Sequence, residues 1–258
     1  MDAPRATAPR RLFRAALRTA IVVLATIVVV AAAWFTYLRF RDRAQTDRTT
    51  ARFEPPVWAG QNVPGACSGG FYARGATGIV LTIVAHCAEP GTTLKTAAGE
   101  VIGTFGPRAQ LTECPTDRFC APSDFLALEL ADRWIPWGHL DMVDLGAGGY
   151  RTLAPGTRAL ACGDIHVGDR VEVDGREHYR TGSVTAVAPY QYASDTMFPC
   201  MAVADIETVV GDSGGAVLVD GQPAGVVSRS LGGRMGFTPL AEGLENLGLE
   251  LCTTPNCD

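Results

Sequence analysis

A glycine-rich segment around Ser213 has the composition of a nucleophile loop. It runs Gly211-Asp212-Ser213-Gly214-Gly215 and stands directly before the apolar run 216–219. A serine hydroxyl attacks a carbonyl only when a base removes its proton and fixed donors hold the oxyanion that forms. Flanking glycines allow the main chain to turn two N–H groups toward that oxygen, and Gly211 and Ser213 are the predicted donors. The alternative is an ordinary turn, because Gly, Asp and Ser favour turns for local reasons.

The base must be a histidine, and the chain has four: His86, His139, His166 and His178. Only His86 follows an apolar, strand-like run and precedes a cysteine, in Leu81-Thr82-Ile83-Val84-Ala85-His86-Cys87. The other three are interpreted as structural or solvated. His86 is therefore the candidate base.

Asp124 is the candidate acid that orients this histidine. It stands in Ser123-Asp124-Phe125-Leu126-Ala127-Leu128, immediately before an apolar run that should be buried. A buried carboxylate needs a partner. An imidazole N–H would satisfy it, and the pairing would fix the histidine tautomer and stabilise the imidazolium. Most aspartates before strands are turn residues, so Asp124 is a candidate only in combination with His86 and Ser213.

Taken in order, TIVAHC, DFLAL and GDSGG resemble the three catalytic motifs of chymotrypsin-like serine peptidases. The bacterial branch with alpha-lytic protease and the streptogrisins is most similar, through Cys67-Ser68-Gly69-Gly70-Phe71, the segment 74–78 and the segment 101–105. The resemblance covers about residues 66–251. It implies two six-stranded antiparallel β-barrels, with His86 and Asp124 on the first and Ser213 on the second. It also implies a Cys67–Cys87 bridge beside the histidine.

The same resemblance suggests substrate-binding residues. Ser228 ends the segment 225–228, which resembles the strand that hydrogen-bonds the substrate main chain, and Gly236 resembles a wall of the specificity pocket. Glu207 falls near the base of that pocket in a simple count and would favour arginine or lysine if it points inward; the alternative is an outward surface glutamate. No Ile-Val-Gly-Gly start is present, and Val209 stands where many relatives have a cysteine. The mode of activation and the shape of the specificity pocket should therefore differ from those of the family that the chain resembles.

The cysteines predict that the part of the chain that carries them lies outside the cytoplasm. There are eight, and none forms a CxxC pair typical of a zinc or redox site. Disulfides persist only in oxidising compartments. Cys252 and Cys257 bracket a turn-forming sequence that a local bridge can close. Elimination pairs Cys162 with Cys200 and Cys114 with Cys120, a connectivity that the sequence leaves open.

An apolar segment over residues 19–38 is predicted to be a transmembrane helix, because it is uncharged and about as long as a bilayer is thick. The arginines before it predict a cytoplasmic N-terminus over 1–18, and the polar segment 39–57 is interpreted as a stalk. A cleaved signal peptide ending near Ala31-Ala32-Ala33, which would give a secreted protein, is the alternative.

The rest of the chain, residues 58–258, is predicted to be an all-β domain with one C-terminal helix. Short apolar runs alternate with turn residues, and hairpins are expected at Asp174-Gly175 and Asp220-Gly221. Leu240, Leu244, Leu247 and Leu251 have helical spacing. Beyond residue 50 there are 13 basic and 24 acidic side chains, which argues against nucleic acid as a partner.

These features together predict a monomeric serine endopeptidase that acts outside the cytoplasm at the membrane, with a protein or peptide substrate and the lipid bilayer as partners. The mechanism needs no metal and no organic cofactor. Two alternatives remain open. One is a catalytically silent, protease-like domain that binds or senses peptides, and the other is an esterase-type acyl hydrolase, which the same chemistry would permit.

Overall fold

The computed structural model describes residues 54–63, 67–109, 112–113, 119–120, 123–175, 179–192 and 196–258, together with Val30. The compact unit that holds the candidate residues runs from Phe53 to Asp258. Val57, at the end of the predicted stalk, is already fully buried in its core, and its N–H donates to the carbonyl of Trp134 over 2.8 Å. The packed domain therefore includes Val57.

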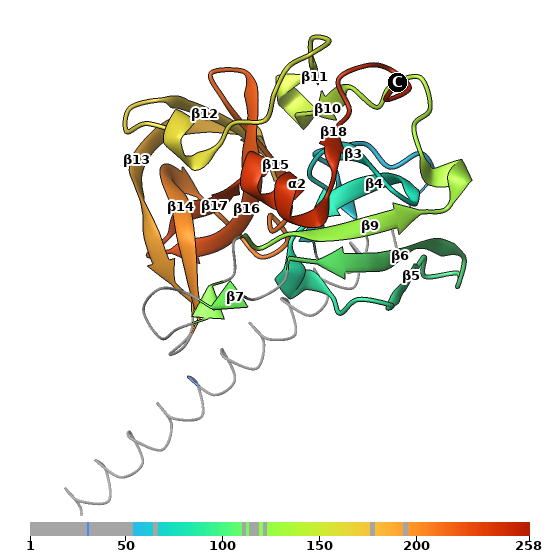
Figure 1. Ribbon diagram of the computed structural model, residues 1–258, viewed down its shortest axis with the longest axis horizontal. Coiled ribbons are helices and arrows are strands. Elements are labelled where there is room, and N and C mark those ends of the chain that lie inside the picture. Colours follow the sequence, from blue (N-terminus) through green and yellow to red (C-terminus); the bar gives the residue numbers. More distant parts are fainter. Residues whose placement is uncertain are drawn as a thin grey trace, which may run out of the picture. The chain divides into compact units, whose positions relative to one another are not determined.

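The first half of the domain is a six-stranded antiparallel sheet in the order β18-β3-β4-β9-β6-β5. Its strands are β3 (Tyr72–Gly75), β4 (Gly78–Ile83), β5 (Thr93–Lys95), β6 (Val101–Arg108), β9 (Leu126–Leu130) and β18 (Glu250–Leu251). The buried run 80–83 lies on β4, next to β9. Figure 1 shows these strands as one group, mostly in cyan and green.

The second half is a closed ring of six antiparallel strands. It contains β12 (Arg170–Asp174), β13 (Tyr179–Gln191), β14 (Thr196–Glu207), β15 (Ala216–Val219), β16 (Gln222–Leu231) and β17 (Arg234–Pro239). The order β13-β12-β15-β16-β17-β14 closes through pairing of β14 with β13 (Figure 1, yellow to red). Two short strands, β7 (Thr112–Glu113) and β8 (Phe119–Cys120), extend this sheet from β14.

Short elements complete the domain. Two small sheets pair β1 (Asn62–Val63) with β2 (Cys67–Ser68) and β10 (Met142–Asp144) with β11 (Tyr150–Thr152). Four 3-10 turns cover Ala85–Cys87, Asp132–Trp134, Gly146–Gly148 and Cys162–Asp164. The predicted hairpin at Asp220-Gly221 is present, and both residues have positive φ, of 49° and 78°, as a tight turn between strands requires.

Strand β15 belongs to both halves of the core. All four of its residues are buried. Because side chains on a strand alternate between faces, Ala216 and Leu218 pack in the core of the first sheet, whereas Val217 and Val219 pack in that of the second. The segment with Ser213 leads directly into this strand.

The predicted C-terminal helix is confirmed as α2 (Leu240–Leu247), but it ends before Leu251. Gly248 adopts a left-handed conformation with φ of 63° and terminates the helix. Leu251 instead lies on β18, opposite Ala73 of β3. The apolar spacing alone does not separate a helix from a strand that follows it.

The predicted fold class is correct for the all-β domain with its C-terminal helix, and it is wrong in adding a single transmembrane helix before that domain. In the described part of the chain, no helix is both long enough and apolar enough to cross a bilayer. Apart from Val30, the segment 19–38 lies outside the described residues, as do residues 1–18 and most of the predicted stalk. That helix was predicted from the apolar character and length of the segment and from the arginines that flank it.

Three disulfides tie the described chain together, and they confirm the prediction that this domain is disulfide-bonded. They join Cys67 to Cys87, Cys162 to Cys200 and Cys252 to Cys257. Cys114, the predicted partner of Cys120, lies outside the described residues. Bridges of this kind indicate an oxidising, extracellular location.

Candidate active site

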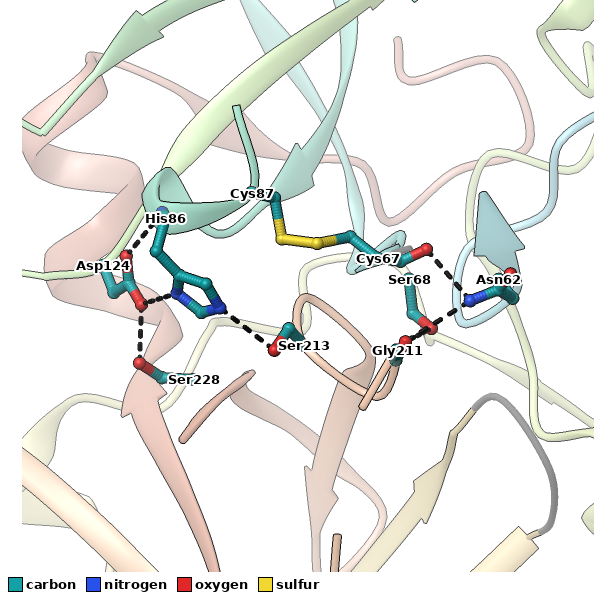
Figure 2. Close-up of a disulfide and its surroundings, with 9 residues drawn as sticks. All are labelled: Asn62, Cys67, Ser68, His86, Cys87, Asp124, Gly211, Ser213 and Ser228. Atoms are coloured by element: carbon teal, nitrogen blue, oxygen red, sulfur yellow. Dashed lines mark hydrogen bonds and ion pairs between the residues drawn. A yellow bond between two sulfur atoms is a disulfide. The ribbon is translucent and has the colours of Figure 1, made fainter. Parts of the chain in front are cut away.

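The structure brings His86, Asp124 and Ser213 together from three separate parts of the chain. His86 Nδ1 lies 2.7 Å from Asp124 Oδ2, and His86 Nε2 lies 3.0 Å from Ser213 Oγ. Figure 2 shows the imidazole between the carboxylate and the hydroxyl. The arrangement can transfer a proton from the hydroxyl to the ring while the carboxylate holds the opposite nitrogen.

His86 is positioned by the end of β4 and by a disulfide. It lies in the 3-10 turn Ala85–Cys87, which follows the buried strand directly. The Cys67–Cys87 bridge ties that turn to β2 (Figure 2). The imidazole is 28% exposed, so one edge remains open to a reactant. His139 and His166 are exposed outside this cluster, and His178 lies outside the described residues.

Asp124 is buried and satisfied by several donors. Only 4% of its side chain is exposed. Its Oδ1 accepts the backbone N–H of His86 at 3.2 Å, and its Oδ2 accepts the hydroxyl of Ser228 at 2.6 Å. Burial acts to raise the pKa of Asp124, but the hydrogen bond and charge of His86, the Ser228 hydroxyl and the charge of Arg229 together lower it below its ordinary value. The carboxylate is therefore ionised at neutral pH.

The Ser228 hydroxyl has a partner that the sequence did not predict, and the predicted main-chain contact with a substrate stays a prediction. The hydroxyl is buried against Asp124, as Figure 2 shows. Only its main chain remains for a substrate. Gly236 lies on β17, opposite Arg229 of β16, and Glu207 is exposed at the end of β14, opposite Arg234. The role of Glu207 in a specificity pocket stays a prediction.

The loop that carries Ser213 depends on two glycines with positive φ. Gly211 has a φ of 106° and Gly214 a φ of 88°. A Cβ on Gly214 would lie 2.1 Å from the carbonyl oxygen of Ser68, so no other residue fits there without a shift of the main chain. Within the described chain, neither the Gly211 N–H nor the Ser213 N–H donates to another backbone group. Both predicted oxyanion donors thus lack a backbone acceptor within the described chain.

Asn62 and Ser68 hold the other side of this loop. The Ser68 hydroxyl donates to the carbonyl of Gly211 at 2.8 Å, and the Asn62 amide donates to the same oxygen at 3.3 Å (Figure 2). The Ser68 N–H donates to the carbonyl of Ser213 at 2.6 Å. These bonds fix the loop from the N-terminal strands.

Arg180 is a residue that sequence reasoning missed. Its Nη2 lies 2.7 Å from Asp212 Oδ2, and its Nη1 donates to the carbonyl of Glu207. The Asp212 side chain is only 1% exposed and also accepts the Val209 N–H at 2.8 Å. Arg180 therefore holds both ends of the segment 207–212. The only sequence signal was an arginine on a strand and an aspartate beside the serine, 32 positions apart.

We expect Arg180→Met to lower the rate at which Ser213 reacts, because it removes the guanidinium that pairs with the buried Asp212 carboxylate. Removing one partner of a buried ion pair costs about 3–5 kcal/mol. If half of that cost falls on the loop conformation, kcat/KM drops about tenfold to a hundredfold. The measurement is kcat/KM for peptide cleavage. Arg158→Met, at an exposed pair with Asp164, is the matched control, and equal rates for both variants would contradict the role of Arg180.

The charges of Arg180 and Asp212 act on Asp174, and its ionisation gives a prediction for how the stability of the fold depends on pH. Burial and the charge of Asp144 raise the pKa of its carboxyl from 3.8 to about 6, against the opposing charge of Arg180; Asp212 raises it further. Because the folded pKa lies above the unfolded one, ionisation of Asp174 destabilises the fold as the pH rises from about 4 to 6. We expect Asp174→Asn to be more stable than the wild type at pH 7.5 and to lose this advantage at pH 4.

Urea denaturation of both oxidised proteins between pH 4 and 7.5 measures this difference. The control is Asp169→Asn, at a carboxylate in a loop whose Oδ2 accepts the N–H of His166. A stability difference between wild type and Asp174→Asn that does not change with pH would contradict the predicted ionisation.

Comparisons with known proteins agree with this fold. The chain aligns with a chymotrypsin from Cellulomonas bogoriensis at 23% identity and a TM-score of 0.57, over 77% of this chain and 100% of that one. It aligns with the Nocardiopsis protease NAPase at 21% identity and a TM-score of 0.57, over 76% and 98%. An alpha-lytic protease homologue, N4, aligns at 18% identity and a TM-score of 0.54, over 76% and 98%.

No protein-family model matches the sequence, and no curated protein matches it either. At these identities, the solved structures establish the chymotrypsin-like fold alone. The activity has to be argued from the side chains.

Proposed function

We propose that this protein is a serine endopeptidase that hydrolyses peptide bonds through an acyl-enzyme on Ser213. The observation that carries the proposal is the single imidazole of His86, within hydrogen-bond distance of both the Asp124 carboxylate and the Ser213 hydroxyl. Acyl transfer requires a buried carboxylate, a partly exposed imidazole and a hydroxyl on a glycine-rich loop, and all three occur here.

In the proposed first half of the reaction, His86 Nε2 takes the proton of Ser213 as Oγ attacks the scissile carbonyl. The carbonyl oxygen becomes an oxyanion, which the N–H groups of Gly211 and Ser213 bind. The imidazolium then gives its proton to the leaving amine, and the peptide bond breaks. In the second half, water attacks the acyl-enzyme with His86 again as base, which releases the acid and restores Ser213.

The main chain of β16 supports a peptide as the substrate. Strand β15 pairs with β16 only as far as Val226, and the N–H of Val227 then bonds to the carbonyl of Gly215. From Ser228 on, no described strand pairs with this edge of β16, since β17 occupies the opposite edge. An extended peptide can add to such an edge as a further strand, and Ser228 is one hydrogen bond from Asp124.

The test uses the full chain, produced under oxidising conditions and treated with a fluorophosphonate probe. We expect one adduct, located on Ser213 by mass spectrometry, and cleavage of a peptide library. An unlabelled protein with its disulfides formed would support a peptide-binding domain without turnover instead. Labelling with turnover of ester substrates alone would support an acyl hydrolase.

A further inference from the structure

Arg229 lies beside the open edge of β16, one residue beyond Ser228. Its charge contributes to the lowered pKa of Asp124. Ser228 points toward Asp124 (Figure 2). The pairing of β16 with β17 shifts by one residue between Val227 and Arg229, so Ser228 occupies a bulge and Arg229 lies opposite Gly236. The position is adjacent to the site but outside the hydrogen-bonded cluster.

Two aromatic rings hold the guanidinium in place. Its central carbon lies 3.7 Å from the ring centroid of Tyr192 and 5.8 Å from that of Phe198. Phe198 is buried, and its ring lies 5.6 Å from that of Tyr192 and stacks on Tyr190 at 6.5 Å. Cation–π contact with a ring face fixes an arginine without neutralising it. The side chain is therefore pre-positioned with its charge intact.

The charge of Arg229 has no ionic partner within the described chain. No carboxylate there lies within ion-pair distance, and Nε and Nη2 are covered by neighbouring atoms without accepting groups to bond. The carboxylate of Asp124, whose pKa the charge of Arg229 lowers, already accepts from His86 and Ser228. A half-buried cation with covered, unbonded donors is costly. An anionic group brought by a ligand against the exposed part of this half-buried side chain would offset part of that cost.

A peptide that pairs antiparallel with β16 would bring a side chain to this cation. With the residue before the scissile bond opposite Ser228, the next residue toward the peptide's N-terminus lies opposite Arg229. Residues directly opposite each other in an antiparallel pair share a face of the sheet. We propose that Arg229 selects an acidic side chain, glutamate or aspartate, two residues before the scissile bond. This inference rests on the proposed function, because it names the substrate class of the same site.

The first test needs no variant. The full chain is offered fluorogenic peptides that carry Glu, Gln or Lys two residues before the scissile bond. The residue directly before that bond is an equimolar mixture of amino acids. One charge-assisted hydrogen bond in a half-buried site predicts a kcat/KM about tenfold higher for Glu than for Gln, with Lys lowest. The preference should shrink as the salt concentration rises. Equal rates for the three peptides, or a preference for Lys, would overturn the proposal.

Variants at the same position give a second readout. Arg229→Glu should invert the order of the Glu and Lys peptides, and Arg229→Met should bring the three rates within about twofold of one another. Arg170→Glu makes the same charge change on β12, beside the turn at Asp220, and should keep the wild-type order. If Arg229→Met retains that order, the preference has another source and the inference is wrong.

The outcomes separate this inference from the function on which it rests. Labelling of Ser213 and cleavage of any library peptide support the endopeptidase whatever residue stands opposite Arg229. Cleavage without an acidic preference overturns the selectivity alone and leaves Arg229 as a structural cation against the rings of Tyr192 and Phe198. Absence of both labelling and cleavage overturns the proposed function and this inference together.

Discussion

Replacing Ser213 with alanine should lower kcat/KM for peptide cleavage about a millionfold, the scale seen when the nucleophile of a hydroxyl–imidazole pair is removed. The reason is chemical, since without Oγ no covalent acyl-enzyme forms. A low residual rate should remain, because the N–H groups of Gly211 and Ser213 persist as oxyanion donors. The Cβ of alanine fits where the serine Cβ stands, so the fold should not change.

The measurement combines steady-state kinetics with fluorophosphonate labelling, which should disappear in the same variant. Ser183→Ala, at a serine on β13, should leave both readouts at the wild-type level. If Ser213→Ala still reacts with the probe, the nucleophile is a different residue and the proposed mechanism fails.

Replacing Asp124 with asparagine should lower kcat/KM about ten-thousandfold at neutral pH. The carboxylate accepts from His86 Nδ1 at 2.7 Å and so keeps the proton on that nitrogen, leaving Nε2 free to accept the proton of Ser213. An asparagine amide can donate to Nδ1, which would place the ring proton on Nε2 and remove the base. It also leaves the imidazolium of the transition state without its counter-charge.

This effect should appear in kcat, with KM nearly unchanged, because the change acts on the transition state more than on bound substrate. Asp132→Asn, at a carboxylate that accepts from Trp137 at the surface, is the matched control. A wild-type kcat in Asp124→Asn would show that some other group sets the tautomer of His86.

Local patterns in the sequence account for much of the fold. The strands β4, β9, β12, β15 and β16 coincide with apolar runs between turn residues, and the turn at Asp220-Gly221 follows from its composition. The helix boundary at Gly248 was not predicted, because Leu251 continues the same spacing on a strand. The membrane-spanning helix was predicted from hydrophobicity, length and flanking arginines, which are local properties and do not depend on how the rest of the chain packs.

The candidate site was predictable where each residue stands in a motif, and not where it depends on a distant partner. His86, Asp124 and Ser213 each occur in a recognisable segment. The contacts of Ser228 with Asp124 and of Arg180 with Asp212 join positions 104 and 32 apart. Such pairs depend on how segments far apart in the sequence pack together, which no local pattern encodes. Arg229 was missed for the same reason, since its significance comes from the rings of Tyr192 and Phe198.

Because β15 gives alternate side chains to two hydrophobic interiors, neither half of the domain can open without exposing residues of the strand that follows Ser213. Loss of order in one sheet would therefore destabilise the other, and the domain should denature as one cooperative unit. The hydroxyl stands just before this shared strand and the imidazole just after β4 of the first sheet, so their alignment should persist until the whole domain unfolds.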